Sequence, residues 1–176
     1  MAPIALCAVL VIDLRRLEQA PAEVRGEISG EDPVWSGAGL ELAGPVVVRA
    51  TADGSSTRGV WVRGSLSGRI RSQCRRCLEP LELEVAEDFD LYFDPKAAVT
   101  DEDMTLHTLD PRAEELDLRA PVGERFVLVA PDFPVCREEC LGLCPQCGVN
   151  WNEMECNCSA AEVDSRWGPL NELKER

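Results

Sequence analysis

Residues 60–93 read VWVRGSLSGRIRSQCRRCLEPLELEVAEDFDLYF, and the pattern of this stretch decides the fold. Apolar and polar residues alternate on both sides of the central QCRRCLEP, with the period of two that is typical of half-buried β-strands. In the first half, Val60, Val62, Gly64, Leu66, Gly68 and Ile70 share one side, and arginines and serines occupy the other. The central segment is short enough to end a hairpin. We therefore predict two long neighbouring strands joined by a turn that holds Cys74 and Cys77.

The outward sides of these two strands carry opposite charges. The second strand faces inward with Leu81, Leu83, Val85, Phe89, Leu91 and Phe93, and outward with Glu82, Glu84, Asp88 and Asp90. Only Glu87 breaks the inward set. Pairing of the strands would bring arginines beside carboxylates, which is a favourable cross-strand contact. The two glycines of the first strand indicate bulges or a close approach of another backbone.

The rest of the chain adds further strands and one helix. Residues 8–17 favour a strand that leads into a turn, residues 40–52 favour another strand, and the Pro- and Gly-rich residues between them favour a loop. Residues 94–115 read as an acidic loop with one short strand at 105–108. The helical spacing of Leu118, Val122, Phe126 and Val129, stopped by Pro131, predicts a helix near 118–130.

The predicted fold class is α+β, a mainly antiparallel β-sheet with a covering helix and a C-terminal cysteine-rich zinc knuckle. We expect a β-rich core domain at 1–133 and a metal-binding segment at 134–176. The chain has 176 residues, 45% of them apolar, so it can bury a core without help from its cysteines.

The sequence favours a cytoplasmic protein. No stretch reaches the roughly 20 apolar residues of a membrane span. The apolar ALCAVLVI near the start follows no basic segment, which argues against a signal peptide. In the cytosol thiols stay reduced, so clustered cysteines bind metal more often than they form disulfides. The total of nine cysteines is odd, which also suits a disulfide framework poorly.

A run of cysteines near the C-terminus predicts a metal site. The segment LCPQCGVN at 143–150 has the C-P-x-C-G form of a zinc knuckle, whose turn points N–H groups at both sulfurs and whose glycine allows a positive φ. One zinc ion takes four thiolates in a closed structural site. Cys144 and Cys147 supply the first pair, and the second is either Cys136 with Cys140 or Cys156 with Cys158. A two-metal cluster of all six and an iron–sulfur cluster stay open as alternatives. The candidate ligands are Cys136, Cys140, Cys144, Cys147, Cys156 and Cys158.

Cys74 and Cys77 form a separate C-x-x-C pair. Three interpretations stay open: structural thiols, metal ligands shared with the C-terminal cluster, or a redox pair. A thioredoxin-like redox motif needs a βαβ context, whereas this pair lies at the end of a predicted hairpin. Cys7 lies in an apolar run and is expected to be a buried packing residue.

The formal charge of −14 makes non-specific nucleic-acid binding a poor default, because phosphate backbones repel an acidic chain. The charge is uneven: residues 49–76 carry a net +6 and residues 79–117 a net −12. Two solvated faces would explain this distribution. The sharper interpretation is an acidic surface for a basic partner, beside a small basic patch that contacts RNA locally. The candidate partner-binding residues of that patch are Arg69, Arg71, Arg75 and Arg76.

Nothing in the sequence assembles an active site. There is no glycine-rich phosphate loop and no nucleophile elbow, and the single histidine, His107, has no catalytic neighbours in its pattern. We therefore expect no enzymatic activity.

Three segments together resemble one family. They are QCRRCLEP at 73–80, LDLRAPVGERFVLVAPDFPVC at 116–136 and CLGLCPQCGVNWNEMECNCSAAEVDSRWGPLNEL at 140–173. In this order they are similar to the YceD family, the large ribosomal RNA subunit accumulation proteins. The resemblance implies a non-enzymatic cytoplasmic factor that supports 23S rRNA accumulation and large-subunit assembly.

The charge distribution suggests how such a factor acts. The acidic region is expected to bind a basic large-subunit ribosomal protein or assembly factor, with no membrane and no small-molecule substrate involved. Two alternative functions stay open. One is a zinc-ribbon regulator that binds nucleic acid, and the other is a thiol redox protein that uses Cys74 and Cys77.

Overall fold

The computed structural model describes residues 10–54, 59–96 and 105–158. The chain divides into two compact units. The sheet unit consists of Met1–Ser72 and Pro80–Asp132, and the cysteine unit consists of Gln73–Glu79 and Phe133–Arg176. Each unit is described by itself.

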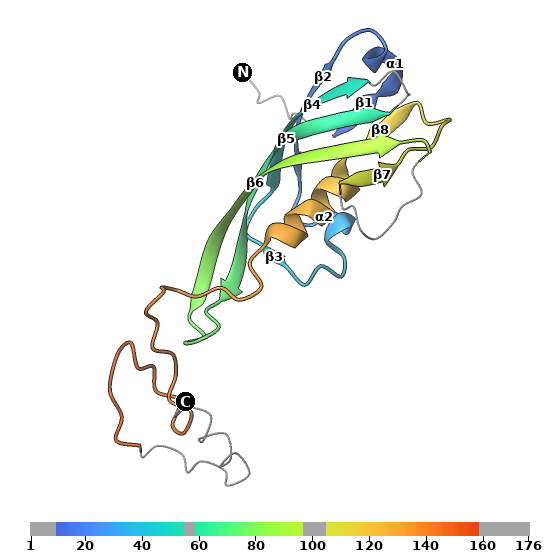
Figure 1. Ribbon diagram of the computed structural model, residues 1–176. Coiled ribbons are helices and arrows are strands. Elements are labelled where there is room, and N and C mark those ends of the chain that lie inside the picture. Colours follow the sequence, from blue (N-terminus) through green and yellow to red (C-terminus); the bar gives the residue numbers. More distant parts are fainter. Residues whose placement is uncertain (1–9, 55–58, 97–104, 159–176) are drawn as a thin grey trace, which may run out of the picture. The chain divides into compact units, whose positions relative to one another are not determined.

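The sheet unit is built on a six-stranded sheet (Figure 1). Its strand order is β2 (Ala22–Ile28), β4 (Val46–Gly54), β5 (Val60–Gln73), β6 (Pro80–Asp94) and β7 (Leu106–Thr108), and β3 (Glu41–Leu42) also pairs with β5. The β2–β4, β4–β5 and β3–β5 pairs are antiparallel, whereas β7 runs parallel to β6. The predicted antiparallel-rich sheet is therefore confirmed, with one parallel pair at its border.

The two long strands follow the predicted alternation. Along β5 the inward residues are buried or half-buried and the outward residues are exposed, and β6 alternates in the same way without interruption. The predicted contact between opposite charges is also present. Arg63 Nε lies 2.8 Å from Asp90 Oδ1, and Arg69 Nη1 lies 2.6 Å from Glu82 Oε1. Glu87, which breaks the apolar set, is half-buried and pairs with Arg125 of the helix.

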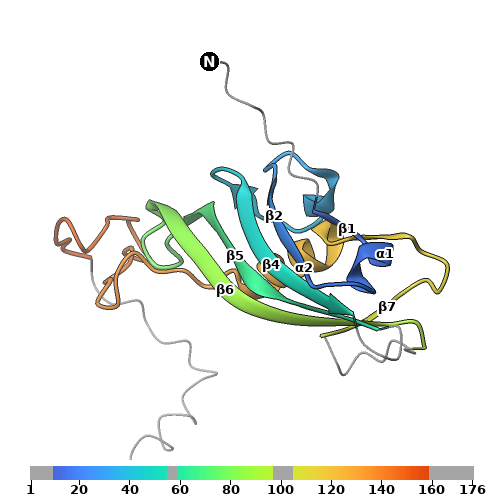
Figure 2. The same ribbon diagram turned by 90° about the horizontal axis from the view of Figure 1, so that it is seen from above.

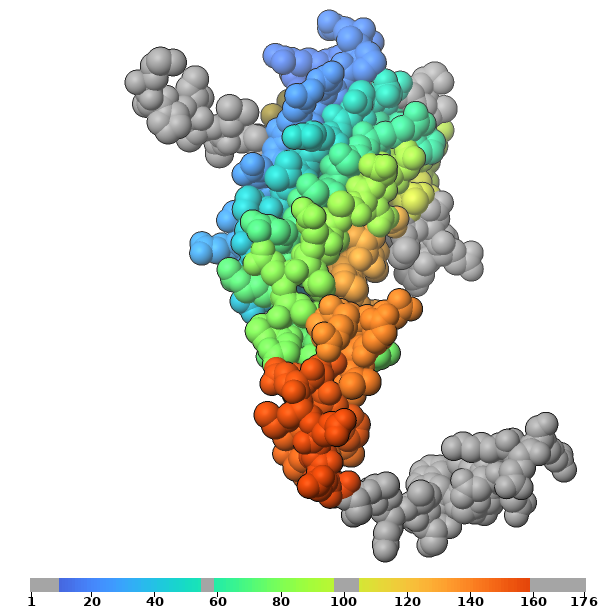
Figure 3. All heavy atoms as spheres, turned by 90° about the vertical axis from the view of Figure 1, so that its left-hand side faces the viewer, coloured from blue at the N-terminus to red at the C-terminus, as the bar shows by residue number. Residues whose placement is uncertain are grey.

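One helix covers a face of the sheet (Figures 1 and 2), and β2, β4, β5 and β6 lie side by side on the face seen in Figure 3. This helix, α2 (Arg119–Val129), carries Pro121 in its first turn, where proline is tolerated, and its C-cap residue Ala130 is followed by Pro131. Its fully buried Phe126 packs edge-to-face on Trp35, with ring centroids 5.6 Å apart. Trp35 ends a short 3₁₀ turn, η1 (Pro33–Trp35).

A second, two-stranded sheet pairs β1 (Val11–Asp13) with β8 (Glu115–Asp117). A single helical turn, α1 (Leu14–Leu17), follows β1, and the Asp13 carboxylate caps it by accepting a bond from the Arg15 N–H. In the described part of the chain, no helix is both long enough and apolar enough to cross a membrane.

Several short elements differ from the predictions. In the described part of 8–17, the expected strand is β1 and the expected turn is the helical turn α1. The strand expected at 40–52 divides into β3 and β4 around Gly44 and Pro45. The stretch between them is not all loop, because β2 occupies Ala22–Ile28. Its alternation is visible only as Val24, Gly26 and Ile28, and the glycine weakens that pattern. β8 was not predicted, since three residues show no period.

Candidate metal centre

Both cysteine clusters lie in the cysteine unit. The first begins in the turn between β5 and β6, where the Cys74 N–H donates to the Glu79 carbonyl at 2.9 Å and the Leu78 N–H donates to the Cys74 carbonyl at 2.9 Å. Leu78 adopts a φ of 62°, in the left-handed region. A third bond, from the Arg75 N–H to the Pro134 carbonyl at 2.8 Å, joins this turn to the segment that carries Cys136.

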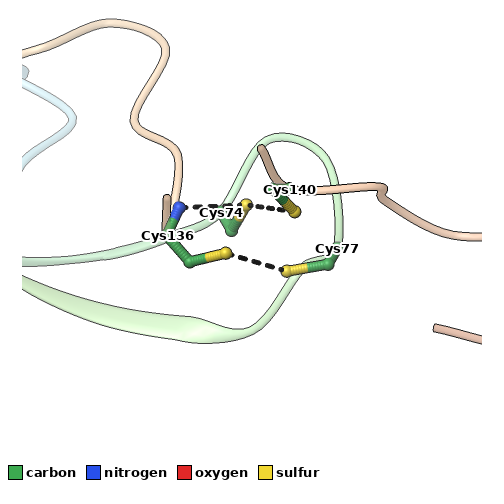
Figure 4. Close-up of side chains that lie close together, drawn as sticks. All are labelled: Cys74, Cys77, Cys136 and Cys140. Atoms are coloured by element: carbon green, nitrogen blue, oxygen red, sulfur yellow. Dashed lines mark hydrogen bonds between the residues drawn. The ribbon is translucent and has the colours of Figure 1, made fainter. Parts of the chain in front are cut away.

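Figure 4 shows the first tetrad, defined as Cys74, Cys77, Cys136 and Cys140. The Cys74 and Cys140 sulfurs lie 3.8 Å apart, and the Cys77 and Cys136 sulfurs 3.7 Å apart. All four lie within 4.8 Å of one another. Thiolates bound tetrahedrally to one zinc ion at about 2.3 Å lie about 3.8 Å from each other. The tetrad therefore fits one zinc-sized ion, and these distances are far too long for disulfides.

Donors from the chain surround the sulfurs of the first tetrad. The Arg76 and Cys136 N–H groups donate to Cys74 Sγ at 3.4 and 3.3 Å, and the Asn152 amide donates to Cys140 Sγ at 3.4 Å. Burial by itself would raise the pKa of Cys74, but backbone N–H bonds from Cys77, Cys136 and Arg76 lower it to about 6. The neighbouring Cys140 sulfur and burial raise the pKa of Cys136 to about 12. Four adjacent thiols cannot all ionise without a cation to balance their charge.

The second tetrad consists of Cys144, Cys147, Cys156 and Cys158, whose sulfurs also lie within 4.8 Å of one another. It is built on the predicted knuckle. The Gly148 N–H donates to the Cys144 carbonyl at 2.9 Å, Gly148 has a φ of 73°, and Leu143 and Asn150 form an antiparallel bridge. Only glycine adopts such a φ without a steric cost.

The second tetrad has the same mixture of acidic and weakly acidic thiols. The backbone N–H groups of Cys147 and Gln146 lower the pKa of Cys144 to about 6, whereas the Cys147 thiol and burial raise the pKa of Cys158 to about 12. The Trp151 indole N–H donates to Cys156 Sγ at 3.3 Å. Trp151 therefore contacts a candidate ligand directly.

The short segment between the tetrads, Cys140–Cys144, is held from two sides. On one side the Arg76 guanidinium donates to the Glu138 and Cys140 carbonyls at 2.9 and 3.0 Å, and the Arg76 carbonyl accepts from the Leu143 N–H at 3.2 Å. On the other side the Asn152 side-chain oxygen accepts from the Leu141 N–H at 3.0 Å. One arginine and one asparagine thus fix the spacing of the two clusters.

The structure divides the predicted ligands between two sites, whereas a single site was one of the predictions. Cys144 and Cys147 lie with Cys156 and Cys158, whereas Cys136 and Cys140 lie with Cys74 and Cys77. Of the interpretations left open for the C-x-x-C pair, this geometry favours metal ligands shared with the C-terminal segment. The sequence feature that could have indicated two sites is the number of closely spaced cysteine pairs. The four pairs, 74/77, 136/140, 144/147 and 156/158, supply eight thiols, enough for two four-coordinate sites. Cys7 lies outside the described residues.

The four candidate partner-binding arginines all have partners within their own unit. In the sheet unit Arg69 pairs with Glu82, and the Arg71 guanidinium lies 3.4 Å from Glu41. In the cysteine unit Arg75 lies over the Phe133 ring, 5.6 Å from its centroid, and Arg76 binds the carbonyls described above. These arginines are thus engaged in intramolecular contacts.

Comparisons with known proteins give one family and several relatives. The family described as large ribosomal RNA subunit accumulation protein YceD matches residues 62–174. An uncharacterized protein of Mycobacterium tuberculosis is 32% identical over 174 residues, which cover 93% of this chain and 81% of the relative.

Two further relatives match over different lengths. An uncharacterized protein of Mycobacterium leprae is 24% identical over 96% of this chain and 79% of its own length. A chloroplastic YCED homolog of Arabidopsis thaliana, named a large ribosomal RNA subunit accumulation protein, is 32% identical over 66 residues, 38% of this chain and 21% of that protein. No solved structure gives a significant match.

Proposed function

The chain belongs to the YceD family, and we propose that it is a non-enzymatic factor that supports 23S rRNA accumulation and assembly of the large ribosomal subunit. The observation that carries the proposal is the family match over residues 62–174, which includes most of β5, all of β6 and all eight cysteines of the two tetrads. The Arabidopsis relative is named a large ribosomal RNA subunit accumulation protein, which supports the rRNA part of this role.

Zinc is the cofactor that the tetrads favour. Thiolates are soft ligands, and zinc in a structural site takes four of them in tetrahedral geometry. Each tetrad would hold one ion through its four sulfurs, leaving no coordination position for a substrate. Bound zinc would supply charge balance for the thiolates and a fixed geometry for the chain around them. This arrangement supports a structural role for both sites.

The partner is proposed to be a basic ribosomal protein or assembly factor that binds the outward face of β6. Glu84 and Asp88 are exposed on that face, and neither forms an ion pair with a described residue. Arg69 and Arg71, by contrast, already contact carboxylates. A basic protein therefore fits this surface better than a phosphate backbone does, since a phosphate needs free cations.

The two alternative functions have weaker support. A zinc ribbon that binds nucleic acid needs a basic surface, but residues 136–158 carry a net charge of −3, and their one arginine, Arg137, donates to Asn152 at 2.8 Å. A redox function needs Cys74 and Cys77 to be available as a pair. Their sulfurs lie within one group of four, beside those of Cys140 and Cys136, so they are not available as a separate pair.

The proposed function is tested in cells depleted of the protein, by measuring the ratio of 23S to 16S rRNA together with their precursors. We expect a selective loss of 23S rRNA. Wild-type protein should restore the ratio, and the double variant Glu84→Gln/Asp88→Asn should restore it poorly, because the surface that binds the basic partner loses two negative charges. The matched control is Glu23→Gln/Glu27→Gln, which removes two exposed charges from β2. An unchanged ratio after depletion would refute the role in large-subunit assembly.

A further inference from the structure

Strand β6 forms a border of the sheet along most of its length (Figures 1 and 2). On one side it neighbours β5. On the other side the short β7 pairs only with Tyr92, Phe93 and Asp94. Within the described residues, the β6 segment from Leu81 to Leu91 has no ladder partner on this second side. We call this segment the free edge.

The backbone groups that face this side can be identified by their alternation. The Tyr92 N–H donates to the Thr105 carbonyl at 2.7 Å, and the Asp94 carbonyl accepts from the Leu109 N–H at 3.1 Å. Even-numbered residues therefore point their backbone groups away from β5. The burial of β6 alternates without a break, which leaves no bulge that would change this phase. The free edge therefore presents the N–H and C=O groups of Glu82, Glu84, Ala86, Asp88 and Asp90.

The side chains of these residues determine what can pair there. Four of the five are acidic, and they lie on the outward face of the strand. Proteins commonly protect an exposed edge with charge, bulges or proline, because an unpaired edge invites another strand. Along this edge, only the carboxylates provide such protection. A second copy of β6 would place carboxylates opposite carboxylates, which is unfavourable.

An extended basic segment would both pair with the unpaired backbone groups of this edge and balance the charge of its carboxylates. Alternate lysine or arginine side chains would lie beside Glu84 and Asp88, and the residues that alternate with them would lie on the inward side, beside Leu83, Val85 and Glu87. Its backbone would satisfy the unpaired N–H and C=O groups. Addition of a strand to an exposed edge is a recurrent mode of peptide recognition, in which backbone bonds supply affinity and alternate side chains supply specificity.

We propose that an extended, basic segment of a partner protein adds to the sheet at the free edge of β6, between Glu82 and Asp90. This inference rests on the proposed function, because it specifies how the basic partner binds. It adds that recognition requires the backbone of β6 as well as its carboxylates.

The distinguishing variant is Ala86→Pro, with Ala86→Thr as its matched control. Ala86 is exposed and its N–H points away from β5, so proline there removes an edge donor and leaves the β5–β6 hairpin paired. Threonine keeps the donor and suits a strand. Equal thermal stability and equal metal content of the two variants would show that both are folded.

The first probe is a seven-residue peptide of alternating lysine and valine. We expect it to bind the wild-type protein and to slow amide exchange, measured by NMR, at residues 82, 84, 86, 88 and 90. Ala86→Pro should weaken binding about tenfold, the size expected for the loss of one or two backbone bonds, and Ala86→Thr should not. The matched peptide has the same sequence with every backbone amide N-methylated, so it keeps the charge but loses its backbone donors, and it should bind much more weakly.

Two outcomes would overturn the edge-pairing inference. One is equal binding of the two peptides, and the other is binding without slower exchange at the even-numbered amides. Either result would mean that surface charge alone, without backbone pairing, accounts for binding. The rRNA measurement separates the two proposals. If Ala86→Pro restores 23S rRNA in depleted cells while Glu84→Gln/Asp88→Asn does not, edge pairing is wrong and the proposed function stands. If depletion leaves 23S rRNA unchanged, the proposed function itself is wrong.

Discussion

Gly64 of β5 lies where two backbones approach more closely than any side chain allows. It pairs with Ala50 of β4. A Cβ atom at position 64 would lie 2.2 Å from the Arg49 carbonyl oxygen and 2.7 Å from the Ala50 Cα. Because both are atoms of a strand backbone, neither can rotate away. The β4–β5 pairing at this point therefore depends on the absence of a side chain.

We expect Gly64→Ala to lower the free energy of unfolding by about 2–3 kcal/mol, as overpacking in a well-packed core does. The matched control is Gly44→Ala, because a Cβ there would meet nothing within 4 Å. Its effect should stay within about 0.5 kcal/mol. Urea unfolding of both variants measures the difference. Equal midpoints for the two variants would contradict the close approach seen at Gly64.

This close approach was predictable in part. The glycines at 64 and 68 occupy inward positions of an alternating strand, which indicated that something else fills the space. The structure supplies the neighbours: the backbone of β4 at Gly64, and Phe126 of α2 and Val46 at Gly68. The sequence could not identify them, since they depend on the β4–β5 register and on where the helix packs.

At the scale of elements, predictability follows the length of the pattern. β5 and β6 alternate over 14 and 15 residues, enough to specify strand, face and charge pairing from the sequence. β1 and β8 have three residues each, and they become strands only because they pair with each other. Tertiary pairing decides such short elements, and no local pattern records it.

The grouping of the cysteines shows the same limit. Spacing predicted pairs and the form of the knuckle, but the first tetrad joins Cys74 and Cys77 to cysteines about sixty residues later in the chain. That combination depends on the bond from Arg75 to Pro134 and on the Arg76 contacts with the segment after Cys136. The first is a backbone–backbone bond and the second joins a side chain to a backbone carbonyl, and both connect distant parts of the chain, so spacing alone could not reveal them.

Two independent tetrads predict a defined loss of metal on substitution. Wild-type protein should hold two zinc ions, Cys77→Ser and Cys158→Ser should each hold one, and the double variant none, because each site loses one of four thiolates. Elemental analysis and native mass spectrometry measure the ions per chain. Cys7→Ser, assigned to packing by its sequence context, is the control and should keep two. Loss of both ions from one single variant would contradict independent sites.

At the scale of the whole molecule, the two units differ in what holds them together. The sheet unit buries an apolar core that includes Val46, Val62, Leu66 and Phe126. In the described part of the cysteine unit, the buried apolar side chains are those of Cys74, Cys77, Cys140, Cys144 and Pro134. Its large apolar side chains are exposed instead, among them Leu78, Phe133, Leu141, Trp151 and Met154. A unit with so little apolar core needs another source of stability, and bound metal provides it.

Removal of metal should therefore unfold one unit and spare the other. Hydrogen exchange with a zinc chelator present should become fast at amides such as those of Cys144 and Gly148, whose bonds form the knuckle. Amides in the β4–β5 ladder should stay protected from exchange, because the apolar core stabilises these strands without metal. The chelator saturated with zinc is the control and should change neither set. Protection of the knuckle that survives chelation would mean that its packing, and not the metal, holds it. Simultaneous loss of protection in β4 and β5 would mean that the sheet also depends on the metal sites.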